Sequence, residues 1–166
     1  MFDFTLKYGK QYDLIIDISK SHKFEYLSKT TKYQENQYKS HKSKIVLQET
    51  ILEIVNIYKN FNEIYFPFII DNRGRIYCEP NFFNYQSNEL SKSLILFLKP
   101  GILERDDTLG INYLKIYGGN CYGLDKTSMN YKIEWVNKNI NNIIDYEKDI
   151  LLKKAKSKLL FLAFCL

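Results

Sequence analysis

Apolar residues recur at helical spacing through most of this 166-residue chain. The clearest repeat predicts a helix over 44–61 behind a Ser43 cap. Its apolar face consists of Leu47, Ile51, Ile54, Val55 and Tyr58. An apolar content of 45% and a length of about one domain indicate a packed core and exclude a disordered chain.

Four further helices are expected on the same grounds. They are predicted over 88–98, over 108–117 with a stop at Gly118-Gly119, over 128–145 behind a Ser128 or Asn130 cap, and over 146–160. The exception to this helical pattern is a strand at 64–70 that Pro67 interrupts, with 75–78 as a candidate continuation. The pattern predicts an α+β fold that is mainly helical.

The stretch from Phe66 to Tyr77 joins an apolar run to two of the three arginines in the chain. Arg73 and Arg75 carry planar, permanently charged groups that match phosphate oxygens, and Gly74 lets a backbone pass close to another chain. We interpret the stretch as a buried strand that delivers charge and the flat Tyr77 ring to a nucleic acid. A solvated strand edge or ion-pair network for the arginines, and ordinary packing for Tyr77, stay open as alternatives.

The pattern Asp71-x-Arg73-Gly74-Arg75-x-Tyr77 resembles the signature of single-subunit RNA polymerases of the phage and mitochondrial type. Three later segments resemble further blocks of that family in the same order, and they are 84–94, 114–126 and 161–165. An amphipathic helix containing Trp135 fits between the last two blocks. The resemblance covers roughly residues 30–166.

Three positions depart from the family pattern, namely Asn72, Ser87 and Glu89. Ser87 stands where glycine is usual, which argues against any turn at that position that needs a positive φ. Residues 1–30 resemble none of these blocks. We expect them to form a poorly constrained extension.

The resemblance implies a piece of a polymerase several times longer. Residues 1–62 would be an N-terminal extension and a thumb-like helix, and 63–166 the start of a palm-like domain with a helical insertion and an incomplete sheet. The implied activity is DNA-dependent RNA synthesis by two-metal nucleotidyl transfer, with Mg²⁺ as cofactor. The implied partners are a DNA template, an RNA transcript, nucleoside triphosphates and a transcription factor, with no membrane.

In the family, the metal-binding aspartates, a phosphate-binding lysine and a sugar-selecting tyrosine lie beyond the point that corresponds to Leu166. The resemblance therefore assigns no catalytic residue and no metal ligand in this chain. The acids at Asp106, Asp107 and Asp125 are expected to cap helices or to aid solubility.

The residues that the resemblance does assign are nucleic-acid contacts. It puts Arg73, Arg75 and Tyr77 near the active-site end of the RNA–template hybrid, and Lys92 on a helix that faces the same duplex. Lys42 and Lys44 belong to a basic run that either follows a phosphate backbone or forms a solvated face.

Composition also bears on the origin of the gene, the state of the cysteines and the role of the C-terminal apolar run. Lysine outnumbers arginine 21 to 3, as in AT-rich coding sequences, so we expect an organelle or plasmid gene and a mitochondrial location. Cys78, Cys121 and Cys165 lack Cys-x-x-Cys spacing, which predicts reduced, mostly buried thiols. The longest apolar run, 159–166, is too short for a membrane span and is expected to be a core element.

Two hypotheses follow. The chain is part of a template-directed RNA polymerase, or it is a non-catalytic remnant or relic of a polymerase gene that binds nucleic acid. Tyr131, Trp135 and Tyr146 are expected to be core residues under either hypothesis.

Overall fold

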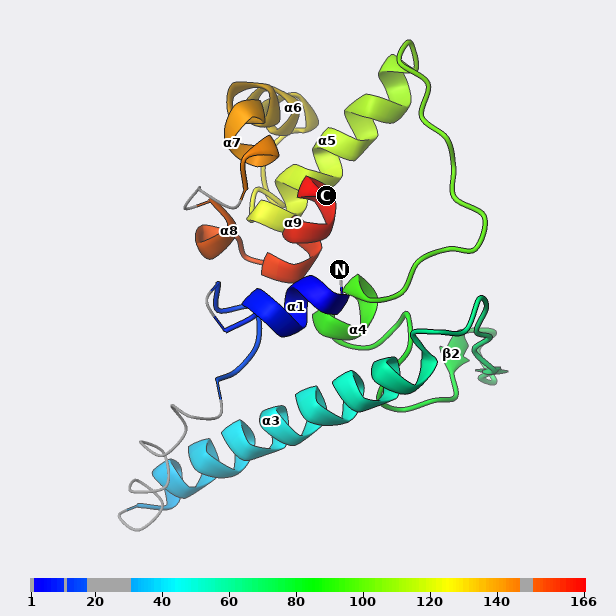
Figure 1. Ribbon diagram of the computed structural model, residues 1–166, viewed down its shortest axis with the longest axis vertical. Helices are drawn as coiled ribbons and strands as arrows, with labels where there is room; N and C mark the ends of the chain where they lie inside the picture. The colour runs from blue at the N-terminus through cyan, green and yellow to red at the C-terminus, as the bar shows by residue number, and fades with distance from the viewer. Residues whose placement is uncertain (1, 11, 18–30, 147–150) are drawn as a thin grey trace. The chain divides into compact units, whose positions relative to one another are not determined.

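The computed structural model describes residues 2–10, 12–17, 31–146 and 151–166, and these form two compact units, 1–95 and 96–166 (Figure 1). Helices dominate, and the sheet of the described residues is one antiparallel pair of strands, which confirms the mainly helical α+β class. None of the helices within the described ranges is long and apolar enough to cross a membrane. The division at 62 into thumb-like and palm-like parts stays a prediction.

Unit 1 is built on one long helix, α3 (Lys32–Tyr58), which begins 12 residues before the predicted start. The Thr31 side chain caps it by accepting a hydrogen bond from the Gln34 N–H at 3.3 Å. The early turns have no apolar repeat, but a Glu35–Lys39 ion pair of 2.6 Å links neighbouring turns on their solvated side. Periodicity therefore missed them, and the predicted Ser43 cap is wrong.

The N-terminal segment is tied to α3. It contains α1 (Phe2–Tyr8), and the buried Gln48 side chain binds the backbone of Ile16 twice, accepting from its N–H at 2.6 Å and donating to its carbonyl at 3.2 Å. The predicted loose extension is thus wrong for the stretch around Ile16. The rest of that prediction, 18–30, lies outside the described residues.

A β-hairpin follows α3. Strands β1 (Phe68–Ile70) and β2 (Ile76–Cys78) pair antiparallel, with Ile69 opposite Tyr77. The second strand therefore returns beside the first and does not continue it, because the chain reverses over residues 71–75. All three side chains of β1 are exposed, so the prediction of a buried strand is wrong within this chain. A short helix, α4 (Glu89–Ser93), completes the unit and contacts α3.

Unit 2 is a helical cluster in which α5 (Thr108–Tyr122) contacts α6 (Met129–Lys138) and α9 (Lys158–Cys165). Tyr122 stacks on Trp135 with ring centroids 4.2 Å apart and meets Phe161 at 5.6 Å. Phe161 and Leu162 are fully buried, which confirms the predicted core role for the first half of the C-terminal apolar run, whereas Leu166 at its end is exposed. Tyr131 is 49% exposed, so its predicted core role is wrong.

Two glycines of α5 explain why this helix extends beyond its predicted end at residue 117. A Cβ at Gly118 would overlap the Phe164 ring, and one at Gly119 would lie 3.0 Å from the Lys132 Cβ. These glycines therefore permit close helix contacts, and the helix ends only at Gly123, which has a φ of 124°.

Other predicted helices are shorter than expected. α4 stops at Ser93, and the 128–145 helix divides at Asn139 into α6 and α7 (Ile140–Ile144). The Asn139 side chain donates to the Trp135 carbonyl at 2.8 Å, a bond that competes with helix continuation. Of the last predicted helix, 146–160, residues 147–150 lie outside the described residues. Its described part contains α8 (Leu151–Lys154) and the start of α9, which a short connection separates.

Candidate nucleic-acid interface

The reversal between the two strands is organised by one carboxylate. Asp71 Oδ1 accepts from the backbone N–H groups of Arg73 and Arg75, each at 2.9 Å, and Oδ2 accepts from Arg75 Nε at 3.0 Å. The Gly74 N–H donates to the Asp71 carbonyl at 3.0 Å, and the φ of Gly74 is 76°. The turn is therefore closed by its own side chain and by the one residue type that adopts this φ readily.

These bonds also fix the charge of Asp71. The N–H of Arg75 contributes most to holding the pKa of this carboxyl below its usual value, and the N–H of Arg73 and the Arg75 guanidinium act in the same direction. The carboxylate is therefore ionised at neutral pH, when it can accept all three hydrogen bonds.

The two arginines are held differently. Arg75 is bound through Nε, and its guanidinium lies 5.7 Å from the centre of the Tyr77 ring. This arrangement fixes the plane of the guanidinium while its side chain stays 58% exposed. Arg73 is also exposed, and within the described residues its guanidinium makes no ion pair. Arg73 and Arg75 thus lie on one exposed turn, next to Tyr77 on β2, and the Arg75–Asp71 ion pair agrees with the ion-pair alternative for Arg75. That these residues contact a nucleic acid stays a prediction.

Lys92 lies on the last turn of α4, where its side chain is exposed. The Asn88 side chain caps this helix by accepting from the Ser91 N–H at 3.0 Å. The hydroxyls of Ser87 and Ser91 both donate to the Phe82 carbonyl, at 3.1 and 3.0 Å. Ser87 does not have a positive φ, so its departure from glycine does not strain the turn.

Lys42 and Lys44 are exposed on α3 but are not part of the arginine turn. They lie about 20 Å along the axis from the C-terminal end of the helix. Figure 1 shows β2 close to that C-terminal end. Because Lys42 and Lys44 are two positions apart in a helix, their side chains also point in different directions from α3. The structure therefore does not group these lysines with Arg73 and Arg75.

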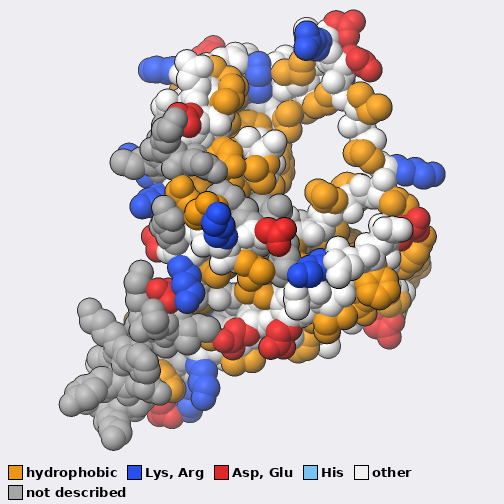
Figure 2. Space-filling model, in the orientation of Figure 1, with side chains coloured by type: hydrophobic (Ala, Val, Ile, Leu, Met, Phe, Trp, Pro, Cys, Tyr) orange, Lys and Arg blue, Asp and Glu red, His pale blue; other side chains and the backbone are white. Residues whose placement is uncertain are grey.

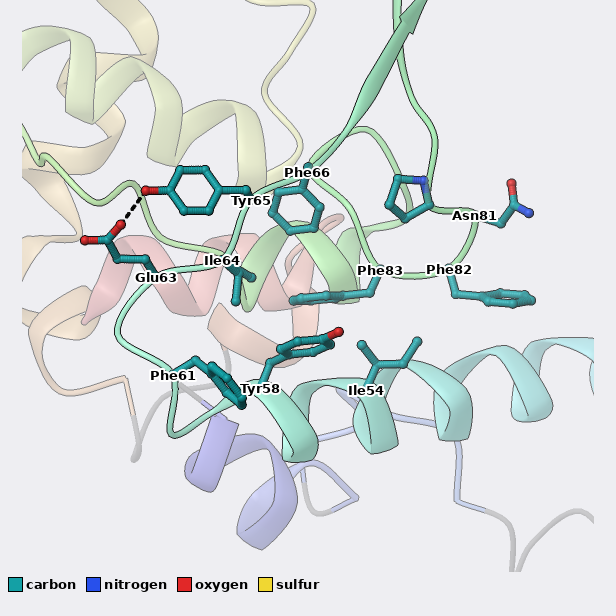
Figure 3. Close-up of a pocket in the computed structure, with 11 residues that line it drawn as sticks. Ile54, Tyr58, Phe61, Glu63, Ile64, Tyr65, Phe66, Asn81, Phe82 and Phe83 are labelled. Carbon is teal, nitrogen blue, oxygen red and sulfur yellow. Dashed lines mark hydrogen bonds between the residues drawn. The ribbon is translucent and has the colours of Figure 1, made fainter.

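An apolar pocket of about 460 Å³ lies in unit 1, between the end of α3 and the segments that flank the hairpin (Figure 3). Aromatic and aliphatic side chains make up most of its lining, and the Tyr65 hydroxyl donates to Glu63 at the rim. Phe66 meets the rings of Phe83 and Tyr85 edge-on, each at 5.9 Å. With no lysine or arginine in its lining, this pocket is not suited to phosphate.

Two of the three acids discussed above, Asp107 and Asp125, have local side-chain partners. Asp107 caps α5 by accepting from the Gly110 N–H at 2.8 Å. Asp125 pairs with Lys156 at 3.3 Å, and this lysine lowers the pKa of the carboxyl. Within the described ranges no group of three His, Cys, Asp or Glu side chains could hold a metal ion. The described residues therefore do not form a two-metal site.

The three cysteines are free thiols. Cys121 is buried, whereas Cys78 and Cys165 are only half-buried. Burial raises the pKa of Cys165 to about 12. This thiol is therefore protonated and unreactive at neutral pH.

Charge of both signs is present on one face of the protein. On the face drawn in Figure 2, basic and acidic side chains alternate between hydrophobic ones, and the coloured atoms form no broad basic patch. The net charge of the full sequence is +5.

Sequence reasoning singled out the arginines but gave no role to Asp71, Asn84 or Gln86. The Asx-turn pattern Asp-x-x-Gly could have indicated the role of Asp71. No local signal points to Gln86, whose side chain binds the backbone of β2 eight to ten residues earlier.

Comparison with known proteins links the chain to one kind of enzyme. The sequence profile of DNA-dependent RNA polymerases matches residues 105–166. A probable DNA-directed RNA polymerase of Podospora anserina is 46% identical over 168 residues, which cover 100% of this chain and 18% of the relative. T7 RNA polymerase of Escherichia phage T7 is 34% identical over 131 residues, covering 76% of this chain and 14% of the relative.

A mitochondrial DNA-directed RNA polymerase of Neurospora crassa is 35% identical over 94 residues, covering 57% of this chain and 6% of the relative. The Podospora match includes residues 1–30, which the motifs left unassigned. The chain spans less than a fifth of the length of each of these curated relatives.

Proposed function

Because the chain belongs to the family of phage-type, single-subunit DNA-directed RNA polymerases, we propose that it supplies the hybrid-binding part of such a polymerase. The complete enzyme would copy a DNA template into RNA from nucleoside triphosphates. The observation that carries this proposal is the turn closed by Asp71, which leaves the side chains of Arg73 and Arg75 exposed, with the Arg75 guanidinium over the Tyr77 ring.

Each side chain of the turn has a separate task. Arg75, oriented by Asp71 and by the ring below it, offers its two Nη groups to one phosphate of the hybrid. Arg73 has more freedom and adds a second phosphate contact. The exposed edge of Tyr77 packs on a sugar or a base, and Lys92 adds a point charge from α4. Lys42 and Lys44 contact a more distant part of the nucleic acid.

The chemistry of the complete enzyme would be nucleotidyl transfer, for which bound Mg²⁺ would supply charge stabilisation. Asp107 caps a helix and Asp125 is in an ion pair, so no step of that reaction is assigned to either. Its residues bind and orient the hybrid.

A mitochondrial template, with a transcription factor as an additional partner, is the proposed setting. The named mitochondrial relative and the AT-rich composition support it. The alternative function is nucleic-acid binding without catalysis, for which the exposed arginine turn alone would suffice.

Purification of the native polypeptide, with an antibody raised against these 166 residues, distinguishes the two functions. We expect the purified polypeptide to incorporate labelled ribonucleotides in a reaction that needs both a DNA template and a divalent cation. A polypeptide of 19.8 kDa that binds an RNA–DNA hybrid but incorporates nothing would instead support the binding function.

A further inference from the structure

One edge of β2 is paired with β1, and the other edge is covered by a single side chain. Gln86 Oε1 accepts from the Cys78 N–H at 2.8 Å, and Gln86 Nε2 donates to the Ile76 carbonyl at 2.9 Å. Residues two apart on a strand direct their backbone groups to the same edge, so one amide reaches both. Because a glutamine amide has the donor and the acceptor of a peptide group, Gln86 takes the place of a neighbouring strand.

Gln86 is itself fixed by buried polar groups. Its backbone N–H donates to Oδ1 of Asn84 at 2.7 Å, and Asn84 is 6% exposed. The same connection leads directly into α4, which the Asn88 cap and the Ser91 hydroxyl hold in place. Ser87 connects the two groups, because its N–H donates to the Asn84 carbonyl at 3.3 Å and its hydroxyl donates to the Phe82 carbonyl that Ser91 also binds. A continuous set of hydrogen bonds therefore joins the strand that follows the arginine turn to the helix that carries Lys92.

Resting on the proposed function, we propose that Gln86 is a positioning residue, whose amide holds the strand of the arginine turn in a fixed relation to α4. A pair of strands alone is marginally stable in water, and the side chains of this pair are mostly exposed. The two hydrogen bonds of the Gln86 amide at the free edge of β2 add stability that the two strands alone lack. It thereby presents Arg73, Arg75 and Lys92 to the hybrid as one surface.

Gln86→Glu tests the positioning role in the 166-residue chain. At neutral pH the introduced carboxylate still accepts from the Cys78 N–H but repels the Ile76 carbonyl. When the introduced carboxyl group is protonated, its O–H can again donate to the Ile76 carbonyl. This hydrogen bond favours the neutral form and raises the pKa of the group, so that the protonated form is present at about pH 4.5. Gln37→Glu, on the exposed surface of α3, makes the same charge change without touching the hairpin.

Two readouts are compared, amide hydrogen exchange at Cys78 and affinity for a short labelled RNA–DNA hybrid. At neutral pH we expect roughly tenfold faster exchange at Cys78 in Gln86→Glu than in Gln37→Glu, as for the loss of about one hydrogen bond. We also expect weaker hybrid binding by Gln86→Glu. Both differences should shrink at about pH 4.5.

Equal exchange at Cys78 in the two variants at both pH values would overturn the claim that the Gln86 side chain stabilises the free edge of β2. Faster exchange with unchanged hybrid affinity would overturn the positioning role and leave Gln86 a purely structural residue. A wild-type chain that does not bind the hybrid would refute the proposed function. The exchange comparison would then still test separately whether Gln86 stabilises the edge of β2.

Discussion

Replacement of Gly74 by alanine isolates the conformational demand of the arginine turn. The φ of Gly74 is 76°, and a Cβ added there would meet no atom of this chain within 4 Å. The cost of Gly74→Ala is therefore that of a left-handed backbone alone, about 1–2 kcal/mol. Such a cost raises the fraction of open turn by a factor of roughly 5–30.

Gly74→Asn and Gly101→Ala are the matched variants. Asparagine adopts a positive φ more readily than alanine, so Gly74→Asn should open the turn less than Gly74→Ala. Gly101 also has open space around it but no positive φ, and Gly101→Ala should leave the turn unchanged. Hydrogen exchange at the Asp71 amide, which donates to the Arg75 carbonyl at 2.9 Å, measures the opening. The reasoning is refuted if Gly74→Ala and Gly101→Ala exchange alike.

Hybrid binding separates this conformational role from the predicted close approach of another chain at Gly74. If conformation alone matters, Gly74→Asn binds the hybrid better than Gly74→Ala. If the backbone of the nucleic acid passes close to Gly74, the larger asparagine binds worse than alanine, although its turn is the better formed.

Three further predictions concern charge and packing. The pKa of Asp71 is lowered in the folded chain, so its carboxylate stabilises the turn fully above the unfolded pKa of about 3.9, and this stabilisation is lost as pH falls through the lower folded pKa. Hydrogen exchange at the Arg75 amide, corrected for its intrinsic rate, should therefore become less protected in acid. Asp71→Asn should abolish this pH dependence. Leu162→Ala, at a fully buried position, should lower the free energy of unfolding by about 2–5 kcal/mol in urea titrations. Leu166→Ala, at a position that is 64% exposed, should change it by less than about 0.5 kcal/mol, and equal losses would contradict the core assigned to unit 2.

The fold class could be predicted because apolar periodicity and one Pro-interrupted strand are local signals. Local signals also misled. The start of α3 at Lys32 depends on a Thr31 cap and an ion pair on a polar face, neither of which has an apolar repeat. Gly118 and Gly119 indicated a helix stop, but they serve close contacts with residues more than ten positions away, Phe164 and Lys132.

The candidate site was predicted in part for the same reason. Two arginines and a tyrosine around one glycine can be read from neighbouring letters, and the structure brings them together at one turn. The residues that hold this turn act through backbone geometry. Gln86 reaches β2 from the next segment, and Lys42 and Lys44 are separated from the turn by the length of α3, a distance that sequence order does not reveal.

The most direct test of the arginine turn as a nucleic-acid contact is a salt titration of hybrid binding by the wild-type chain, Arg73→Ala, Arg75→Ala and Arg105→Ala. These variants remove one arginine each, so they share the same change in net charge. We expect the two hairpin variants to bind more weakly at low salt, because each leaves a phosphate of the hybrid without its arginine. Their slopes of log affinity against log salt should be shallower by roughly 0.9 for each such phosphate, and Arg105→Ala should keep the wild-type slope. The same slope for all four proteins would contradict the assignment of the arginine turn to nucleic-acid binding.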